Sequence, residues 1–181
     1  MNFDEFETIF RDSEMRAWLS WDLLRKPDTQ ITEIYSRSRD DLANLHTVWY
    51  ATPEGANGDW RNASDRPLRV SEAAQTFNDW PSERAPHINF FQTQFERYGY
   101  PIQLTLPAYS PNGHDTIILD GTHRAVAAHL AQKDVRLIIF ALQGPCDPDI
   151  LPDLMHYSSR FSSSSLSSAI SGYPTAARRI E

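Results

Sequence analysis

The chain has 181 residues, of which 40% are hydrophobic, and its formal net charge is −7 at pH 7. This composition excludes a disordered chain, and the acidic balance argues against nonspecific binding to nucleic acid, which depends on Lys and Arg side chains at phosphates. The single cysteine, Cys146, excludes a disulfide framework and a zinc site made of cysteines. No apolar run reaches the ~18 residues of a membrane span, and the acidic N-terminus differs from a signal peptide, so we expect a cytoplasmic protein without a membrane partner.

The first 85 residues show mainly the apolar spacing of helices, with hydrophobic side chains recurring three and four positions apart. The helices predicted here cover residues 3–26, 30–50 and 71–77. The end of the second pattern, Val48-Trp49-Tyr50, is also compatible with a short strand. Prolines and glycines interrupt residues 52–67, which we therefore expect to form a loop.

From residue 87 onward, helical and strand patterns alternate. The predicted helices are 87–98, 122–132 and 148–157, and the predicted strands are 101–106, 116–119 and 135–142. A Pro-Asn-Gly turn separates the first two strands, so we expect them to form a hairpin or to be neighbours in a sheet.

This order of elements predicts an α/β (α+β) fold. We expect a single domain over residues 1–157, in which a mainly helical N-terminal part (1–85) precedes a core (86–142). Residues 158–168 contain eight serines, and the whole segment 158–181 is expected to be a flexible tail.

The stretch Leu119-Asp120-Gly121-Thr122-His123-Arg124 points most directly to function, because an apolar strand ends there in an Asp-Gly turn and a helix follows. The N–H groups and the dipole at a helix start favour an anion, and Arg124 adds donors suited to phosphate or carboxylate. Thr122 can serve as the N-cap or as a phosphate ligand. His123 can donate to phosphate or act as a general acid or base, and Asp120 can hold Arg124 or His123, or bind Mg²⁺ beside a phosphate.

Each of these side chains also has a purely structural alternative. Arg124 can form a salt bridge to a nearby carboxylate, His123 can bond a backbone carbonyl, and Asp120 can be an ordinary turn residue. His123 and His129 differ by six positions and do not share a helix face, so no histidine metal pair is predicted. The aromatic residues that flank the long loop suit either the core or a cover over a bound base; they are Trp49, Tyr50, Trp60 and Trp80.

The stretch at 119–128 resembles the phosphate-binding motif of the ParB/sulfiredoxin-like superfamily, in which a strand leads through Asp-Gly-x-His-Arg into a helix that begins with small residues. The lead-in at 96–102 and the apolar strand at 135–142 are similar to the same superfamily, so the resemblance covers roughly residues 86–142. It implies a small mixed sheet flanked by helices and a nucleotide phosphate held at the loop. The residues that would cradle this phosphate, carried over by position, are Gly121, Thr122, His123 and Arg124.

Activities known in this superfamily include CTP-dependent DNA partition, ATP-dependent reduction of a sulfinic cysteine, phosphorylation of free serine, and nuclease activity. Thr122 stands where sulfiredoxin has its catalytic cysteine, which excludes thiol chemistry at the motif. The residues after 142 show no helix-turn-helix pattern, which argues against DNA partition. The resemblance then implies a phosphotransferase that uses ATP or another nucleotide with Mg²⁺ and a small-molecule substrate, with Asp120 and His123 as the catalytic residues.

Two alternatives stay open at this level. The loop is also compatible with a non-catalytic ligand sensor or a protein-interaction module whose N-terminal helices recruit a partner protein. A nuclease or DNA-binding protein is a second alternative, which rests on family precedent alone. No motif identifies the base that phosphoryl transfer requires.

Overall fold

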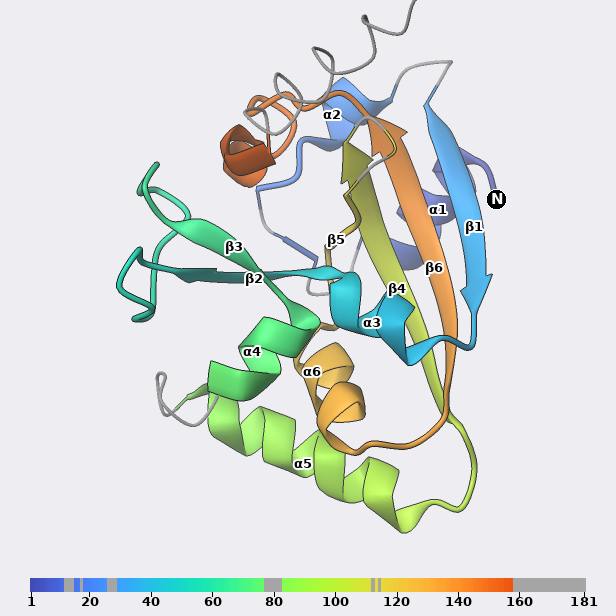
Figure 1. Cartoon of the computed structure of the whole chain (residues 1–181). Helices are drawn as coiled ribbons and strands as arrows, with labels where there is room; N and C mark the ends of the chain where they lie inside the picture. The colour runs from blue at the N-terminus through green and yellow to red at the C-terminus, as the bar shows by residue number, and fades with distance from the viewer. Residues whose placement is uncertain are drawn as a thin grey trace, which may run out of the picture.

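The computed structural model describes residues 1–11, 15–16, 18–25, 29–76, 83–111, 113 and 115–157. Within these ranges the chain forms six α-helices, a 3-10 turn and one six-stranded mixed sheet (Figure 1). The α+β fold predicted from the sequence is therefore confirmed. The Ser-rich segment 158–181, expected to be a tail, lies outside the described residues.

The sheet has the strand order β1-β6-β4-β5-β2-β3. The strands are β1 (Gln30–Ser36), β2 (His46–Ala51), β3 (Arg66–Arg69), β4 (Ile102–Pro111), β5 (Ile117–Ile118) and β6 (Val135–Gly144). At its centre, β4 and β6 pair in parallel along their whole length. The predicted neighbours β4 and β5 pair antiparallel, β5 is parallel to β2, and the two outer strands, β1 and β3, are antiparallel to β6 and β2.

Helices cover the two faces of the sheet unequally. They are α1 (Phe3–Phe10), α2 (Trp21–Leu24), α3 (Arg39–Asn44), α4 (Val70–Thr76), α5 (Arg84–Arg97) and α6 (Thr122–Leu130), with a 3-10 turn at Pro152–Leu154. On one face α6 contacts α3, α4 and α5, as Figure 1 shows. Among the described helices, none is both long enough and apolar enough to cross a membrane.

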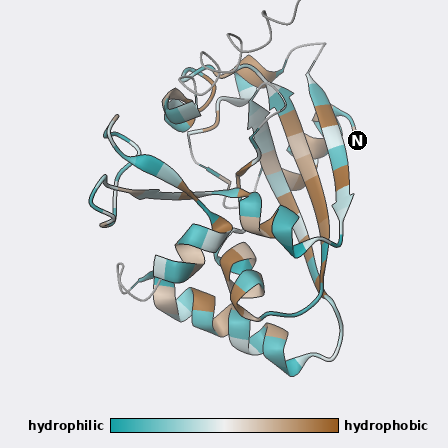
Figure 2. Cartoon of the chain, viewed as in Figure 1, coloured by the Kyte–Doolittle hydropathy of each residue, from teal (hydrophilic) through white to brown (hydrophobic). Residues whose placement is uncertain are grey.

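Two hydrophobic cores lie on opposite sides of the sheet. The first joins the inner side chains of β4 and β6, such as Leu104 and Leu137, to the helices α3–α6. The second joins the other face to α1 and to residues 150–157, through Phe6, Tyr109 and Leu154. Figure 2 shows the corresponding concentration of hydrophobic residues on β6, whereas α5 carries hydrophilic and hydrophobic residues in turn.

The alanine-rich face of α6 is a packing surface. Residues 125–128, Ala-Val-Ala-Ala, are fully buried in the first core. Small side chains allow α6 to lie close to the sheet, which sets the position of the loop that precedes it.

The helix predicted for residues 30–50 is wrong, because this segment forms β1, α3 and β2. The apolar residues Ile31 and Ile34 are three positions apart, a spacing that places side chains on one face of a helix but on opposite faces of a strand. In the structure Ile31 packs against the second core and Ile34 against the first. A strand that is covered on both faces can therefore have the apolar spacing of a helix. The alternative of a strand at Val48-Trp49-Tyr50 is confirmed, because these residues lie in β2.

The N-terminal part is also less helical than predicted. The expected helix 3–26 is reduced to α1 and α2, and Met15 and Arg16 between them are not helical. Residues 1–85 supply β1 at one edge of the sheet and β2–β3 at the other edge. They are therefore built into the same sheet as residues 102–144 and are not an added helical segment.

The elements predicted after residue 70 are confirmed with shifted ends, except at the C-terminus. The predicted closing helix, 148–157, is shorter than expected: a 3-10 turn at Pro152–Leu154 is followed by helical residues 155–157. Pro148 and Pro152 account for this, because proline lacks the N–H group that a helix interior needs.

Candidate functional site

The Asp-Gly loop connects β5 to α6, at the junction of strand and helix that the sequence predicts. Strand β5 ends at Ile118, and α6 begins at Thr122 with Gly121 as its N-cap. A pocket of about 490 Å³ opens at this junction. It is lined by His87, Phe91, Asp120, Gly121, His123 and Arg124. Four of the five predicted site residues thus line one pocket, and α5 adds two further side chains.

Gly121 allows the chain to turn into α6. Its φ angle is +91°, a left-handed conformation that L side chains rarely adopt. A Cβ atom at this position would lie 2.8 Å from Cδ2 of Leu106 and 2.9 Å from Nη2 of Arg124. Glycine has no side chain to accept the first N–H groups of α6, so the N-cap itself leaves them to other acceptors.

Arg124 and Asp120 form an ion pair at the wall of the pocket. Nη2 of Arg124 lies 3.4 Å from Oδ2 of Asp120, four residues earlier. The salt bridge that the sequence left open for Arg124 is therefore present, and Asp120 holds Arg124, one of the roles predicted for it. Both side chains are partly exposed, at 37% and 26%, so a ligand can still reach the guanidinium.

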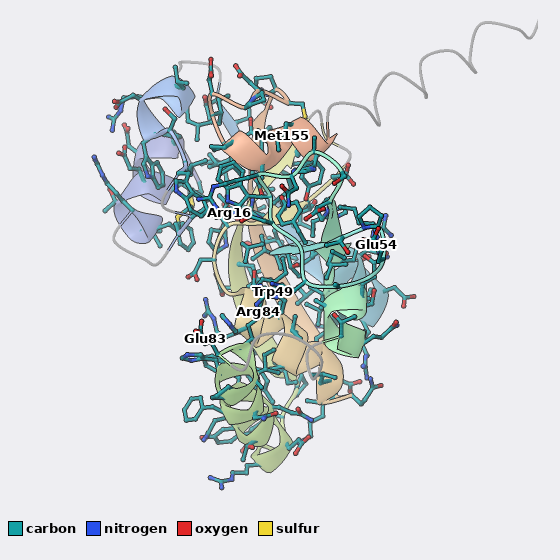
Figure 3. The ribbon with its side chains drawn as sticks, turned by 90° about the vertical axis from the view of Figure 1, so that its left-hand side faces the viewer. Arg16, Trp49, Glu54, Glu83, Arg84 and Met155 are labelled. Carbon is teal, nitrogen blue, oxygen red and sulfur yellow. The ribbon has the colours of Figure 1, made fainter. Side chains whose placement is uncertain are left out.

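Aromatic and imidazole rings surround His123. The ring centroids of Trp49 and His123 are 5.2 Å apart in an edge-to-face arrangement, and those of His87 and His123 are 5.3 Å apart at an interplanar angle of 53°. The guanidinium carbon of Arg84 lies 4.6 Å from the centroid of the Trp49 ring, and Figure 3 shows these two side chains together near the start of α5. Burial lowers the pKa of Arg84, and the charge of Glu83 partly offsets this effect.

Thr122 is placed differently from its neighbours in the motif. The residue is 5% exposed, it does not line the pocket, and its buried Oγ1 has no hydrogen-bond partner among the described residues. The N-cap of α6 is Gly121, so the predicted N-cap role of Thr122 is wrong. In this arrangement the group of Thr122 that is available to an anion at the helix start is its backbone N–H.

The pocket lining contains one carboxylate, Asp120, which is paired with Arg124. In the part of the chain that the structure describes, no three His, Cys, Asp or Glu side chains come together as a metal site would require. His129 lies in the last turn of α6, away from the pocket, and burial lowers its pKa.

The sequence does not single out His87, although the signal is present. Ile88, Phe91 and Phe95 mark the face of α5 that packs toward α6. His87 lies next to Ile88 and four positions before Phe91, which places it at the border of that face. The packing of α5 on α6 brings it to His123.

The aromatic residues around the long loop have several positions. Trp49 and Tyr50 are buried, at 5% and 2% exposure, which confirms the core alternative for these two. Trp60 packs against Trp18 and Arg61. Trp80 lies outside the described residues.

A larger hollow of about 560 Å³ lies on the opposite face of the sheet. It is lined by strand side chains such as Tyr35, Gln103 and Thr105 and by two arginines, Arg37 and Arg136. Its lining includes neither a helix start nor an imidazole. The smaller pocket differs from this hollow in combining an arginine with a helix start and two imidazoles.

A buried polar cluster joins three distant parts of the chain. The Arg16 guanidinium pairs with Asp153 and donates to the backbone oxygen of Thr47 at 3.1 Å. The Tyr50 hydroxyl donates to the same carboxylate at 2.6 Å. Burial, followed by the charge of Asp153, raises the pKa of Tyr50. Figure 3 shows Arg16 close to the C-terminal turn that carries Met155.

Comparisons with known proteins identified no relative of this chain. No protein-family model matches the chain, and no curated protein or solved structure matches it. The resemblance to the ParB/sulfiredoxin-like superfamily therefore rests on the motif at 119–128 and its flanking elements alone.

Proposed function

We propose that this protein binds the phosphate group of a nucleotide or of another small phosphorylated molecule in the pocket formed by Asp120, Gly121, His123 and Arg124. The observation that supports this proposal is that an arginine, two imidazoles and the start of α6 meet in one pocket. Helix N–H groups and guanidinium donors are typical of phosphate sites. The volume of about 490 Å³ falls within the range of roughly 300–1,000 Å³ typical of small-molecule sites.

The resemblance of the motif supports a nucleotide as the ligand and phosphoryl transfer to a small hydroxy compound as the reaction. A bound nucleotide with Mg²⁺ would supply the phosphoryl group. His123 can donate a hydrogen bond to the phosphoryl oxygens, and Asp120 orients Arg124 through their ion pair. Arg124 and the start of α6 stabilise the negative charge on the phosphoryl oxygens.

Substitution of Arg124 tests the binding site. We expect Arg124→Ala to weaken binding of ATP or CTP by about tenfold or more in isothermal titration calorimetry, because a charge-assisted pair of hydrogen bonds is lost. The matched control is Arg136→Ala, since Arg136 is an exposed arginine that lines the hollow on the opposite face. Unchanged binding in Arg124→Ala would contradict the proposal. Loss of binding in Arg136→Ala alone would indicate that the nucleotide binds in the hollow on the opposite face.

The reaction is tested separately from binding. Incubation with ATP or CTP and Mg²⁺ over a panel of small hydroxy compounds should give a phosphorylated product by mass spectrometry, and His123→Asn should reduce its rate. Nucleotide binding without turnover for any compound, together with a stable protein partner in pull-downs, would favour the non-catalytic alternative.

A further inference from the structure

The charge on the walls of the pocket depends on its two histidines. Asp120 and Arg124 pair at 3.4 Å, so their opposite charges largely cancel for a ligand that approaches from solution. The other titratable side chains of the lining are His87 and His123. An imidazole ordinarily changes its charge near pH 6.5. With both imidazoles neutral the lining carries no net charge, and with both protonated it carries two positive charges.

The two imidazoles are close enough to act on one ligand. Their ring centroids are 5.3 Å apart, and the two rings come from different helices, α5 and α6. Two protonated imidazoles at this distance would place two positive charges beside one ligand.

The remaining charges around His87 do not cancel this effect. By helical spacing, Arg84 and Glu83 are the neighbours of His87 on α5, and they carry opposite charges. From the Asp-Gly loop and α6, the charged or titratable groups are Asp120, His123 and Arg124. Strand β2 contributes the uncharged ring of Trp49. Among the side chains that line the pocket, Asp120 and Arg124 offset each other, so the two imidazoles decide the net charge of the lining.

We infer that His87 is a binding residue of this pocket, and that joint protonation of His87 and His123 makes the pocket select a dianion such as a phosphate monoester over a monoanion. This inference rests on the proposed function, because it concerns the same pocket. It adds a ligand residue from outside the Asp-Gly-Thr-His-Arg motif and a requirement for the charge of the ligand.

Sulfate is the sharpest probe, because it stays dianionic over the whole range in which imidazoles titrate. In isothermal titration calorimetry we expect its affinity for the wild-type protein to rise by about tenfold between roughly pH 8 and pH 5.5, since each added positive charge attracts the dianion. Nitrate, a monoanion, should gain much less. Inorganic phosphate should bind best near pH 6–7, because it loses its second charge at lower pH while the imidazoles lose theirs at higher pH.

Three variants separate His87 from its surroundings. His87→Asn should remove most of the pH dependence of sulfate binding, and the exposed position of His87 favours an intact fold, which a thermal melt checks. His129→Gln is the matched control, because it removes another imidazole from α6 outside the pocket and should leave the pH dependence unchanged. Arg124→Ala should weaken sulfate binding across the whole pH range.

The possible results distinguish this inference from the proposed function. Sulfate binding that needs Arg124 but does not change with pH, or that keeps its full pH dependence in His87→Asn, would overturn the inference and leave the phosphate site standing. Failure of sulfate to bind at low pH would also overturn it, because a doubly protonated pocket must attract a dianion. Binding of nucleotide that is unaffected by Arg124→Ala would instead overturn the proposed function.

Discussion

At the scale of single residues, Gly121 determines the geometry of the pocket more directly than any charged side chain. Its positive φ angle turns the chain from β5 into α6, and its missing Cβ leaves room for Leu106 and for the Arg124 guanidinium. The same residue thus sets the direction of the helix start and the position of the arginine. Backbone and side-chain donors are brought to one pocket by a residue that contributes no side chain.

We predict that Gly121→Ala destabilises the protein by about 2 kcal/mol and weakens nucleotide binding, because the left-handed conformation and the crowding of Arg124 both carry a cost. Urea denaturation and calorimetry measure the two effects. Gly55→Ala is the matched control: Gly55 has a φ angle of +85°, but a Cβ there would meet no atom within 4 Å. Equal destabilisation by both substitutions, with nucleotide binding intact in Gly121→Ala, would show that crowding at Gly121 is unimportant.

At the scale of elements, the pocket depends on how α5 lies against α6. Of the residues of α5, only Ile88 is fully buried. The N-cap residue of the helix, Glu83, makes no side-chain capping bond. The C-terminal end of α5 is held by Lys133, whose Nζ donates to the backbone oxygens of Phe95, Glu96 and Tyr98 at 3.0, 2.6 and 2.7 Å. Lys133 follows α6, so it ties the end of α5 to the segment that leads into β6.

We therefore predict that Lys133→Met lowers the free energy of unfolding by about 1–2 kcal/mol, because three carbonyl groups lose a charged donor. It should also speed hydrogen exchange in the last turns of α5. Arg97→Met is the control, since Arg97 is an exposed cation in the last turn of α5 and makes no such contacts to the described residues. Hydrogen exchange in α5 that is equally fast in both variants would contradict a specific role for Lys133.

The elements also show where sequence reasoning succeeds and where it ends. The loop at residues 120–124, α6 and the central strands are specified by local signals: an Asp-Gly turn, small residues on one helix face and an unbroken apolar run. Strand β1 could not be recognised in this way, because Ile31 and Ile34 pack against two cores on opposite faces of the sheet, which gives the strand the apolar spacing of a helix. His87 could not be placed beside His123 because their contact depends on the packing of two helices far apart in sequence.

At the scale of the whole molecule, the buried pair Arg16–Asp153 fastens the N-terminal segment to the C-terminal turn. The Arg16 side chain is 4% exposed and that of Asp153 9%, so neither charge is well hydrated without the other. Tyr50 and the backbone of Thr47 bring β2 into the same cluster. The cluster therefore holds together three segments that secondary structure alone does not connect.

We predict that Asp153→Asn destabilises the protein by about 3 kcal/mol, because it leaves the Arg16 charge buried without its counter-charge. Urea denaturation measures this change. Asp149→Asn, at an exposed aspartate just before the same turn, should cost much less. Similar stability of the two variants would mean that the buried pair contributes little.

The edge position of β1 has a consequence for synthesis on the ribosome. Strand β1 pairs with β6, so that Ser36 meets Leu137 and Gln30 meets Gln143. The nascent chain must therefore carry β1 with both of its edges unpaired until nearly all of the described residues have been made. Pairing of segments so distant in sequence slows folding and exposes strand edges to aggregation. The sheet is therefore completed late in synthesis, because β1, the first strand to be made, gains its partner β6 only near the end.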